Sequence, residues 1–448
     1  MPTLDWIGKK AVLNHHNEVP FHLLRCDPEL SVGEASGNLL VQGDNLLALK
    51  ALLPYYAGQV KCIYIDPPYN TGNEGWVYND NVNSPQMREW LGRAVGSESE
   101  DLSRHDKWLC MMYPRLVLLR EMLREDGSLW MSIDDKEVHN ARHLLELVFN
   151  ANNFVANVIW QKIDSPKNTA VHFSEDHEYI LVFAKNASIW RPNKLPRTEK
   201  MNARYKNPDN DPRGPWLLSD LAARNYYAQG RYAITTPTGR VIEGPPAGSY
   251  WRVSQEKFSE LDNDGRIWWG KTGNNRPGIK RFLSDVQQGA VPQTLWLWQD
   301  VGSTRHSKQE LSKIMNLGAS GDLFITPKPT QLLRRIISIA SNPGDIILDS
   351  FAGSGTTGHA VLQVNSNEDV KRNFILIEME RDIAKEVTAL RLKRAANGYE
   401  RNSQSGIQHE IGLGGGFRFC ELGPTLFDAF GQIRSEVSFA DLARHVFF

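Results

Sequence analysis

The sequence has few cysteines and no long apolar run. Its 448 residues contain four cysteines, which are far apart and form no CxxC pair: Cys26, Cys62, Cys110 and Cys420. This spacing argues against a zinc site or a disulfide framework and fits a reducing cytoplasm. The first residues lack the apolar core of a secretion signal, and no later stretch approaches a membrane span. We therefore expect a cytoplasmic protein without a membrane segment.

A metal centre and a strong overall charge are also lacking. His139 and His143 are four residues apart, but no HExxH glutamate accompanies them, so we expect no metal site. Lys and Arg number 51 and Asp and Glu number 52, which gives a formal net charge of −1. The molecule as a whole therefore has no field to steer it to an anionic partner. Any affinity for nucleic acid must come from local patches.

Strand and helix patterns alternate in two parts of the chain. They occupy residues 38–65 and 108–149 in the first part and 332–380 in the second. Such alternation favours an α/β fold with a parallel sheet. Between the two parts the pattern is irregular, and residues 185–240 carry eleven Lys or Arg against four Asp or Glu, interleaved with aromatic residues.

These changes in pattern predict five segments. In chain order they are an N-terminal arm (1–37), a first half of the sheet domain (38–156), an inserted irregular domain (157–325), a second half of the sheet domain (326–400) and a C-terminal segment (401–448). Because aromatic residues lie among the basic ones, we favour a DNA-contacting surface for the insert over a plain solvated surface. The cations that we expect to include DNA contacts are Arg204, Lys206, Arg213, Arg224, Arg231, Lys280 and Arg281.

The stretch IILDSFAGSGTTG (346–358) has the context of a cofactor turn. A strand enters it, a helix leaves it, and its glycines allow a ligand to approach the backbone closely. Glu378 ends the following strand, where a carboxylate can accept both hydroxyls of a ribose. Alone, the motif leaves a nucleotide site and a plain tight turn equally open. A nicotinamide-dependent oxidoreductase also remains open at this point.

The tetrapeptide DPPY (66–69) follows an apolar strand. Taken by itself, this combination of Asp and Pro favours a simple turn at the end of the strand. It also suits an exocyclic amine that attacks a methyl group. The Asp66 carboxylate and a proline-fixed carbonyl could accept the two N–H groups of the amine and stabilise its developing positive charge. Tyr69 could stack on the base.

Together, DPPY and DSFAGSG (349–355) resemble the amino-methyltransferases that act on adenine N6 in DNA. DPPY comes first, then an insert, then FxGxG, which is the order of the permuted β group. Further motifs resemble the modification (Mod) subunit of type III restriction systems. They are GDNLLALK (43–50), DPPYNTG (66–72), HEYILVFAK (177–185), RPGIKRFLSDV (276–286), VPQTLW (291–296) and FITPKPTQLLRRI (324–336).

The resemblance implies a doubly wound, mostly parallel, Rossmann-like methyltransferase sheet with a circularly permuted motif order. It also implies S-adenosylmethionine as cofactor and roles for individual residues. Asp66, Pro67, Pro68 and Tyr69 would form the catalytic turn around a flipped adenine. The residues implied to bind the cofactor, besides Asp66, are Asp44, Asn45, Lys328, Pro329, Asp349, Phe351, Gly353, Ser354, Gly355, Thr356 and Glu378. Of these, Glu378 would hold the ribose, and Lys328 and Pro329 would close the pocket near the methionine carboxylate.

The resemblance also implies partners. They are double-stranded DNA, a second copy of the chain in a homodimer, and a restriction subunit with helicase and nuclease activity on another chain. Two alternatives stay open. One is a cytosine-N4 methyltransferase with the same fold, although Asp ahead of PPY favours adenine. The other is a subunit that chiefly recognises DNA for a partner nuclease.

Overall fold

The computed structural model describes residues 4–33, 37–69, 104–166, 168–286, 289–316, 326–403, 406–428 and 430–446. The last three residues of the motif at 66–72 and the first two of the motif at 324–336 lie outside these ranges. The chain forms two compact units. One consists of Met1–Asn193 with Pro292–Phe448, and the other of Lys194–Val291. No helix among the described residues is both long and apolar enough to cross a membrane.

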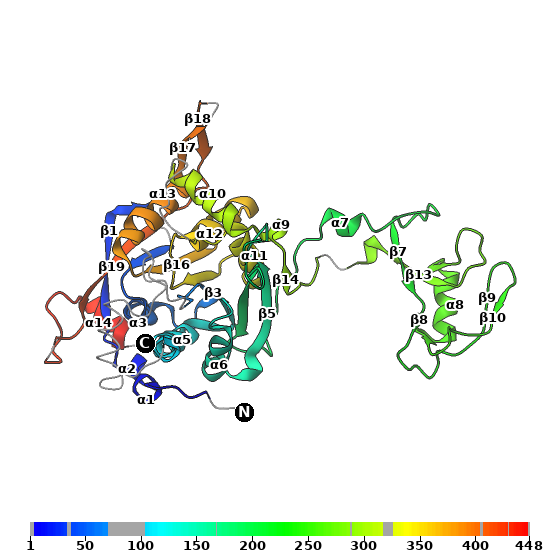
Figure 1. Cartoon of the computed structure of the whole chain (residues 1–448), viewed down its shortest axis with the longest axis horizontal. Coiled ribbons are helices and arrows are strands. Elements are labelled where there is room, and N and C mark those ends of the chain that lie inside the picture. Colours follow the sequence, from blue (N-terminus) through cyan, green and yellow to red (C-terminus); the bar gives the residue numbers. More distant parts are fainter. Residues whose placement is uncertain are drawn as a thin grey trace. The chain divides into compact units, whose positions relative to one another are not determined.

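The larger unit contains a ten-stranded sheet with a parallel centre (Figure 1). Its strands, in sheet order, are β1 (His22–Val32), β19 (Phe417–Thr425), β2 (Leu39–Gln42), β16 (Asn373–Glu378), β15 (Ile346–Asp349), β3 (Val60–Ile65), β4 (Leu123–Ile133), β6 (His177–Ala184), β5 (Phe154–Gln161) and β14 (Leu295–Trp296). From β19 to β4 all neighbours are parallel, whereas β1, β6 and β5 pair antiparallel with their inner neighbours. The predicted mostly parallel α/β sheet is confirmed.

Two groups of helices cover the two faces of this sheet (Figure 1). In the first group α5 (Arg104–Met122) contacts α3 (Asn45–Tyr56) and α6 (Val138–Phe149). In the second, α12 (Thr356–Glu368) contacts α11 (Thr330–Ala340) and α13 (Leu390–Asn397), which in turn contacts α10 (Thr304–Met315). Because helices cover both faces, the central strands are mostly apolar, and all six residues of β3 are buried, including Lys61.

The predicted N-terminal arm and C-terminal segment each contribute a strand to the sheet. Among the strands that the structure describes, β1 pairs with β19 alone, and β19 lies between β1 and β2. Cys26 and Cys420 face each other across β1 and β19 and form a disulfide. The expectation that the scattered cysteines form no disulfide is therefore wrong for this pair. The two cysteines are 394 residues apart in the sequence, and only the strand pairing brings them together.

Shorter elements complete the larger unit. They are α1 (Lys9–Val12), α2 (His15–Glu18), the 3-10 helix η2 (Ala151–Asn153), α9 (Trp298–Val301), the π-helix η4 (Ile383–Ala389), the hairpin strands β17 (Gly398–Ser403) and β18 (Gly406–Ile411), and α14 (Phe439–Val446).

The smaller unit has a core of its own, built around Trp251, Phe258 and Trp269. Its elements are α7 (Glu199–Asn202), β7 (Trp216–Asp220), β8 (Ala222–Ala223), β9 (Ile234–Thr235), β10 (Val241–Ile242), β11 (Tyr250–Trp251), α8 (Gln255–Asn263), β12 (Ile267–Trp268), β13 (Gly278–Phe282) and the 3-10 helix η3 (Leu283–Asp285). Strands β12, β13 and β7 form a sheet, and the other strands pair in twos.

The smaller unit is shorter than the predicted insert of 157–325. β6 and the larger part of β5 fall inside the predicted insert, yet both are strands of the large sheet. Three further elements of the predicted insert also belong to the larger unit, namely β14, α9 and α10. The boundaries were predicted at the points where the alternation of strands and helices stops. The alternation stops earlier than the domain does, because the sheet continues with antiparallel strands.

Candidate active site

Asp66 and Asp349 stand at the ends of two neighbouring parallel strands. Asp66 follows β3 directly, and Asp349 is the last residue of β15. Leu348 of β15 pairs with Ile63 of β3, so both strands end at the same edge of the sheet. Ligands of doubly wound sheets bind at this edge, beyond the carboxyl ends of the strands. The fold thus brings together two carboxylates that are far apart in the sequence.

A small pocket lies at this edge. Its lining consists of Tyr64, Asp66, Thr326, Pro327, Lys328, Asp349, Phe351, Ala352, Gly353, Ser354, Thr356 and Thr357. Seven of these are predicted cofactor residues: Asp66, Lys328, Asp349, Phe351, Gly353, Ser354 and Thr356. The other predicted cofactor residues do not line it, namely Asp44, Asn45, Pro329, Gly355 and Glu378.

The Asp66 carboxylate is held by Lys328 and Tyr69. Lys328 Nζ lies 2.5 Å from Asp66 Oδ2, and the Tyr69 hydroxyl donates a hydrogen bond to Oδ1 at 2.7 Å. Burial raises the pKa of Asp66, an effect that the Lys328 ammonium partly offsets. Because Lys328 directly precedes Pro329 and α11, this ion pair connects the two sequence halves of the sheet domain.

Glu178, in β6, is a second carboxylate at this site, more deeply buried than Asp66, and no sequence motif predicts a role for it. Its Oε2 lies 3.0 Å from the Tyr69 hydroxyl and 3.7 Å from Lys328 Nζ, while Lys162 Nζ lies 3.2 Å from its Oε1. A hydroxyl carries one proton, so Tyr69 donates to either Asp66 or Glu178 at a given moment. Burial acts to raise the pKa of Glu178, but Lys328 and Lys162 outweigh it and lower the pKa.

The turn after β3 is fixed from behind by α5. The Pro68 carbonyl accepts a hydrogen bond from the indole N–H of Trp108 at 2.7 Å, and Trp108 is fully buried. Two prolines restrict the backbone at the same place. The turn is therefore rigid, as a site needs when it must hold a small group in one orientation.

The glycine-rich turn wraps tightly between β15 and α12. Gly353 and Gly355 have φ of 51° and 76°, the left-handed region that glycine adopts without strain. A Cβ on Gly355 would lie 3.0 Å from the side chain of Thr388. Thr388 also donates a hydrogen bond to the Gly353 carbonyl at 2.5 Å. The turn is thus packed against η4 with no room for a side chain at 355.

Two buried carboxylates flank this turn. Asp349 accepts a hydrogen bond from the Phe351 N–H at 3.0 Å, and Glu378 accepts one from the Gly353 N–H at 2.7 Å. Burial raises the pKa of Asp349 to about 7 and that of Glu378 to about 8. Among the described residues, the buried Ser350 hydroxyl oxygen has no hydrogen-bond partner. The site therefore offers polar groups that a ligand with hydroxyl and amine groups can satisfy.

The GDN turn (43–45) lies against the glycine-rich turn. The Gly43 N–H donates to the Glu378 carbonyl at 3.0 Å, and the Asn45 side-chain amide donates to the Ser350 carbonyl at 3.0 Å. Asp44 caps α3 by accepting from two backbone N–H groups, and it pairs with the buried Arg115 at 3.0 Å. Asp44 and Asn45 thus have structural partners here, and their predicted contact with a cofactor stays a prediction.

Arg391, in α13, is a further residue that the sequence analysis missed. Its guanidinium is fully buried and donates to the Ser354 hydroxyl at 3.0 Å and to the Thr356 hydroxyl at 2.8 Å. Both hydroxyls belong to residues that line the pocket. Arg391 lies in the run RLKRAAN, where nothing distinguishes it from its surface neighbours.

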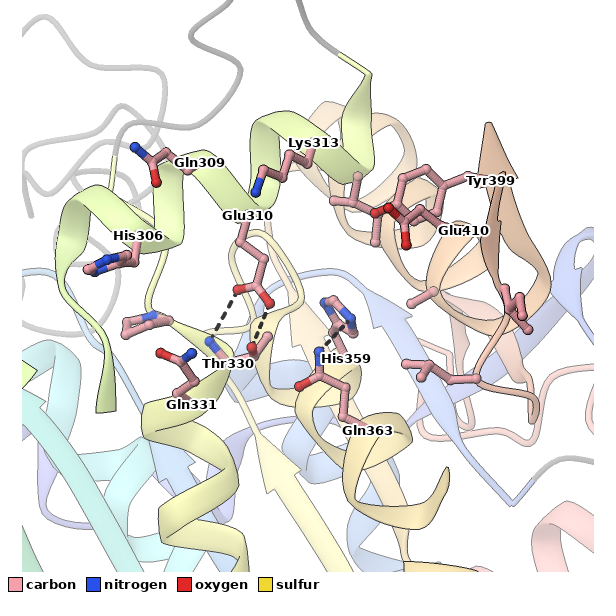
Figure 2. Close-up of a pocket in the computed structure, with 15 residues that line it drawn as sticks. His306, Gln309, Glu310, Lys313, Thr330, Gln331, His359, Gln363, Tyr399 and Glu410 are labelled. Carbon is pink, nitrogen blue, oxygen red and sulfur yellow. Dashed lines mark hydrogen bonds between the residues drawn. The ribbon is translucent and has the colours of Figure 1, made fainter. Parts of the chain in front are cut away.

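A larger cavity of about 370 Å³ lies between α10, the start of α11, α12, α13 and the β17–β18 hairpin (Figure 2). Glu310 accepts hydrogen bonds from the Thr330 hydroxyl at 2.6 Å and from its N–H at 3.3 Å, and so binds α10 to the first residue of α11 (Figure 2). Pro329 lines this cavity rather than the pocket at Asp66. Glu310 therefore helps to fix the segment that carries Lys328.

The predicted DNA-contacting cations of the smaller unit differ in exposure. Lys280 is buried and pairs with Asp209 at 2.5 Å and Asp211 at 3.0 Å, so it is a structural ion pair and not the surface cation that we expected. Arg213 is half-buried and pairs with Asp211 at 2.9 Å. The exposed members of the set are Arg204, Lys206, Arg224, Arg231 and Arg281.

Comparison with known proteins gives consistent matches. Residues 60–389 match the N6_N4_Mtase family, described as DNA methylase. The StyLTI Mod subunit of a type III restriction-modification enzyme from Salmonella typhimurium is 33% identical, over 91% of this chain and 65% of the relative. The EcoPI Mod subunit from Escherichia phage P1 is 31% identical, over 87% and 65%. The type II methyltransferase M.EcaI from Enterobacter cloacae is 30% identical, over 80% and 74%. The chain thus spans about two thirds of the length of these Mod relatives.

Proposed function

The chain belongs to the DNA methylase family, and we propose that it transfers a methyl group from S-adenosylmethionine to the N6 amine of adenine in double-stranded DNA. The observation that carries this proposal is the meeting of Asp66 and Asp349 in one pocket, at the ends of β3 and β15. One carboxylate belongs to the DPPY turn and the other to the glycine-rich turn. Amine and methyl donor would therefore lie side by side.

The residues of the pocket fit such a cofactor. Of the residues that line the pocket, Gly353 and Ser354 would hold the methionine side. Glu378 does not line the pocket and accepts the N–H groups of Gly353 and Glu380; once ionised, it would also accept the ribose hydroxyls. When bound, S-adenosylmethionine supplies a methyl group activated by a sulfonium. Because the methyl group needs no acid catalysis, the protein contributes mainly position and charge.

The DPPY turn would bind the amine. The Asp66 carboxylate and the Pro67 carbonyl would accept its two N–H groups and draw the nitrogen lone pair out of conjugation with the ring. As positive charge develops on the nitrogen, the partly buried Asp66 carboxylate stabilises it more strongly than water would, because the dielectric of the site is lower than that of water. Tyr69 would support the base by stacking, which is worth about 1–3 kcal/mol.

An adenine inside a duplex cannot reach this turn, so the enzyme must flip the base out of the helix. We propose that the exposed cations of the smaller unit, among them Arg224 and Arg231, bind the DNA that carries it. By its similarity to Mod subunits we further propose a cytoplasmic homodimer that modifies sites for a restriction subunit on another chain.

Transfer of labelled methyl groups tests the proposal. The purified chain, incubated with labelled S-adenosylmethionine and unmethylated bacterial DNA, should yield N6-methyladenine on nucleoside analysis. Asp66→Ala should abolish the label, whereas Glu125→Gln, which changes an exposed glutamate paired with Lys185, should retain it. If the DNA contained N4-methylcytosine and no N6-methyladenine, the target would be the N4 amine of cytosine and not the N6 amine of adenine. DNA binding without any transfer by the wild type would favour a recognition subunit.

A further inference from the structure

Lys328 occupies the side of Asp66 that an incoming amine needs. Its ammonium lies 2.5 Å from Oδ2 while the Tyr69 hydroxyl takes Oδ1, so both carboxylate oxygens have a donor. An ammonium at this distance neutralises the charge that should stabilise a positively charged amine, and it repels that amine directly. Methyl transfer at Asp66, on which this inference rests, therefore requires that Lys328 move.

Glu178 is the nearest alternative partner among the described residues. Lys328 Nζ already lies 3.7 Å from Glu178 Oε2, within ion-pair distance, so a small movement suffices. Glu178 is held for this role by Lys162, which binds its other oxygen. The Tyr69 hydroxyl reaches both carboxylates and can donate to whichever of them lacks the lysine.

We propose that Glu178 is a positioning residue that takes Lys328 from Asp66 when the substrate amine binds. The exchange keeps Lys328 paired with a carboxylate at every stage. Before it, Lys328 neutralises Asp66; after it, Lys328 neutralises Glu178, and Asp66 faces the amine alone. Glu178 acts through Lys328 and does not touch the base.

Acetylation of the lysines tests the exchange without DNA, cofactor or activity. The full chain is treated with a trace of acetic anhydride, and acetylation of Lys328 is quantified by mass spectrometry relative to the exposed Lys257. In the Asp66→Asn variant, Lys328 should pair with Glu178 instead. Its acetylation rate should therefore stay within about twofold of the wild-type rate. In Asp66→Asn/Glu178→Gln, Lys328 should react several times faster. Equally fast labelling in the single and double variants would overturn the proposal. If the double variant does not fold, comparing Asp66→Asn with the wild type still tests the proposal. Much faster acetylation of Lys328 in Asp66→Asn would show that Glu178 does not bind the released lysine.

Methyl transfer by a second set of variants tests the catalytic consequence. Glu178→Gln should lower kcat about tenfold without changing the affinity for S-adenosylmethionine. Because Glu178 serves to remove Lys328, the double variant Glu178→Gln/Lys328→Met should be more active than Glu178→Gln alone at saturating cofactor. If Glu178 had only a structural role, the loss of kcat would follow the fall in melting temperature, and the Lys328→Met substitution would restore no activity. If the wild type transfers no methyl group, the proposed function fails, while the acetylation experiment still decides whether Glu178 captures Lys328.

Discussion

The guanidinium of Arg391 donates a hydrogen bond of 2.8 Å to the hydroxyl of Thr356, the first residue of α12. It donates another to Ser354, so one buried side chain fixes the end of the glycine-rich turn. The pocket wall at this turn is therefore held in place from α13, on the side away from any ligand.

Replacing Arg391 by Met should weaken S-adenosylmethionine binding about tenfold, measured by calorimetry, because the turn loses its two hydrogen bonds. Arg391→Lys should restore little, since an ammonium lacks the planar fork of donors. Arg394→Met, on the same helix, removes a bond to the Ile314 carbonyl far from the turn and should keep wild-type affinity. Equal affinities for all three variants would contradict the role of Arg391.

Alanine at Gly355 should lower both the melting temperature and cofactor affinity. Its φ of 76° costs an L-residue about 1–2 kcal/mol, and the new Cβ would also press on Thr388. Gly344→Ala is the matched control, because Gly344 has φ of 88° but nothing within 4 Å of a Cβ. It should show the conformational cost alone and leave cofactor binding intact. An unchanged affinity in Gly355→Ala would refute the crowding argument.

Affinity for S-adenosylmethionine should increase with pH. Hydroxyl donors bind an ionised carboxylate best, but the pKa of Glu378 is raised to about 8 by burial, so at neutral pH the group is mostly protonated. Binding must then release a proton, which costs about tenfold in affinity for each pH unit below the pKa. Calorimetry from pH 6 to 9 should show tightening up to about pH 8 and a plateau above it. Glu378→Gln should bind weakly at all pH values, and a flat wild-type profile would exclude Glu378 as the ribose acceptor.

Lys280 and Arg224 should respond differently to loss of their charge. Lys280→Met leaves Asp209 and Asp211 without their buried cation, so it should destabilise the smaller unit by about 3–5 kcal/mol, seen as a lower melting temperature. Arg224→Ala, at an exposed position, should leave the melting temperature unchanged and weaken DNA binding, with a smaller dependence on salt. DNA affinity that stays unchanged in Arg224→Ala would remove this residue from the proposed contact surface.

Local patterns predicted the centre of the sheet and both turns, because a buried parallel strand must be apolar and must end where its ligand binds. Asp66 and Asp349 could be placed at one edge on that ground alone. Glu178 could not be assigned a role, since its contact with Tyr69 joins residues 109 positions apart and depends on the pairing of β4 with β6. Arg391 was missed for a similar reason: whether an arginine in a basic helix faces water or a buried turn is decided by packing.

The position of β19 constrains how the chain can be made. Among the described strands, β1 has no other neighbour in the sheet, and β19 is completed only at residue 425. On the ribosome, β1 must therefore wait unpaired until residues 33–425 are translated, including the compact unit of Lys194–Val291. Such long-range pairing is slow and leaves strand edges open to aggregation. A nascent chain that stops short of β19 would expose one edge of β2 and leave β1 without a sheet to join.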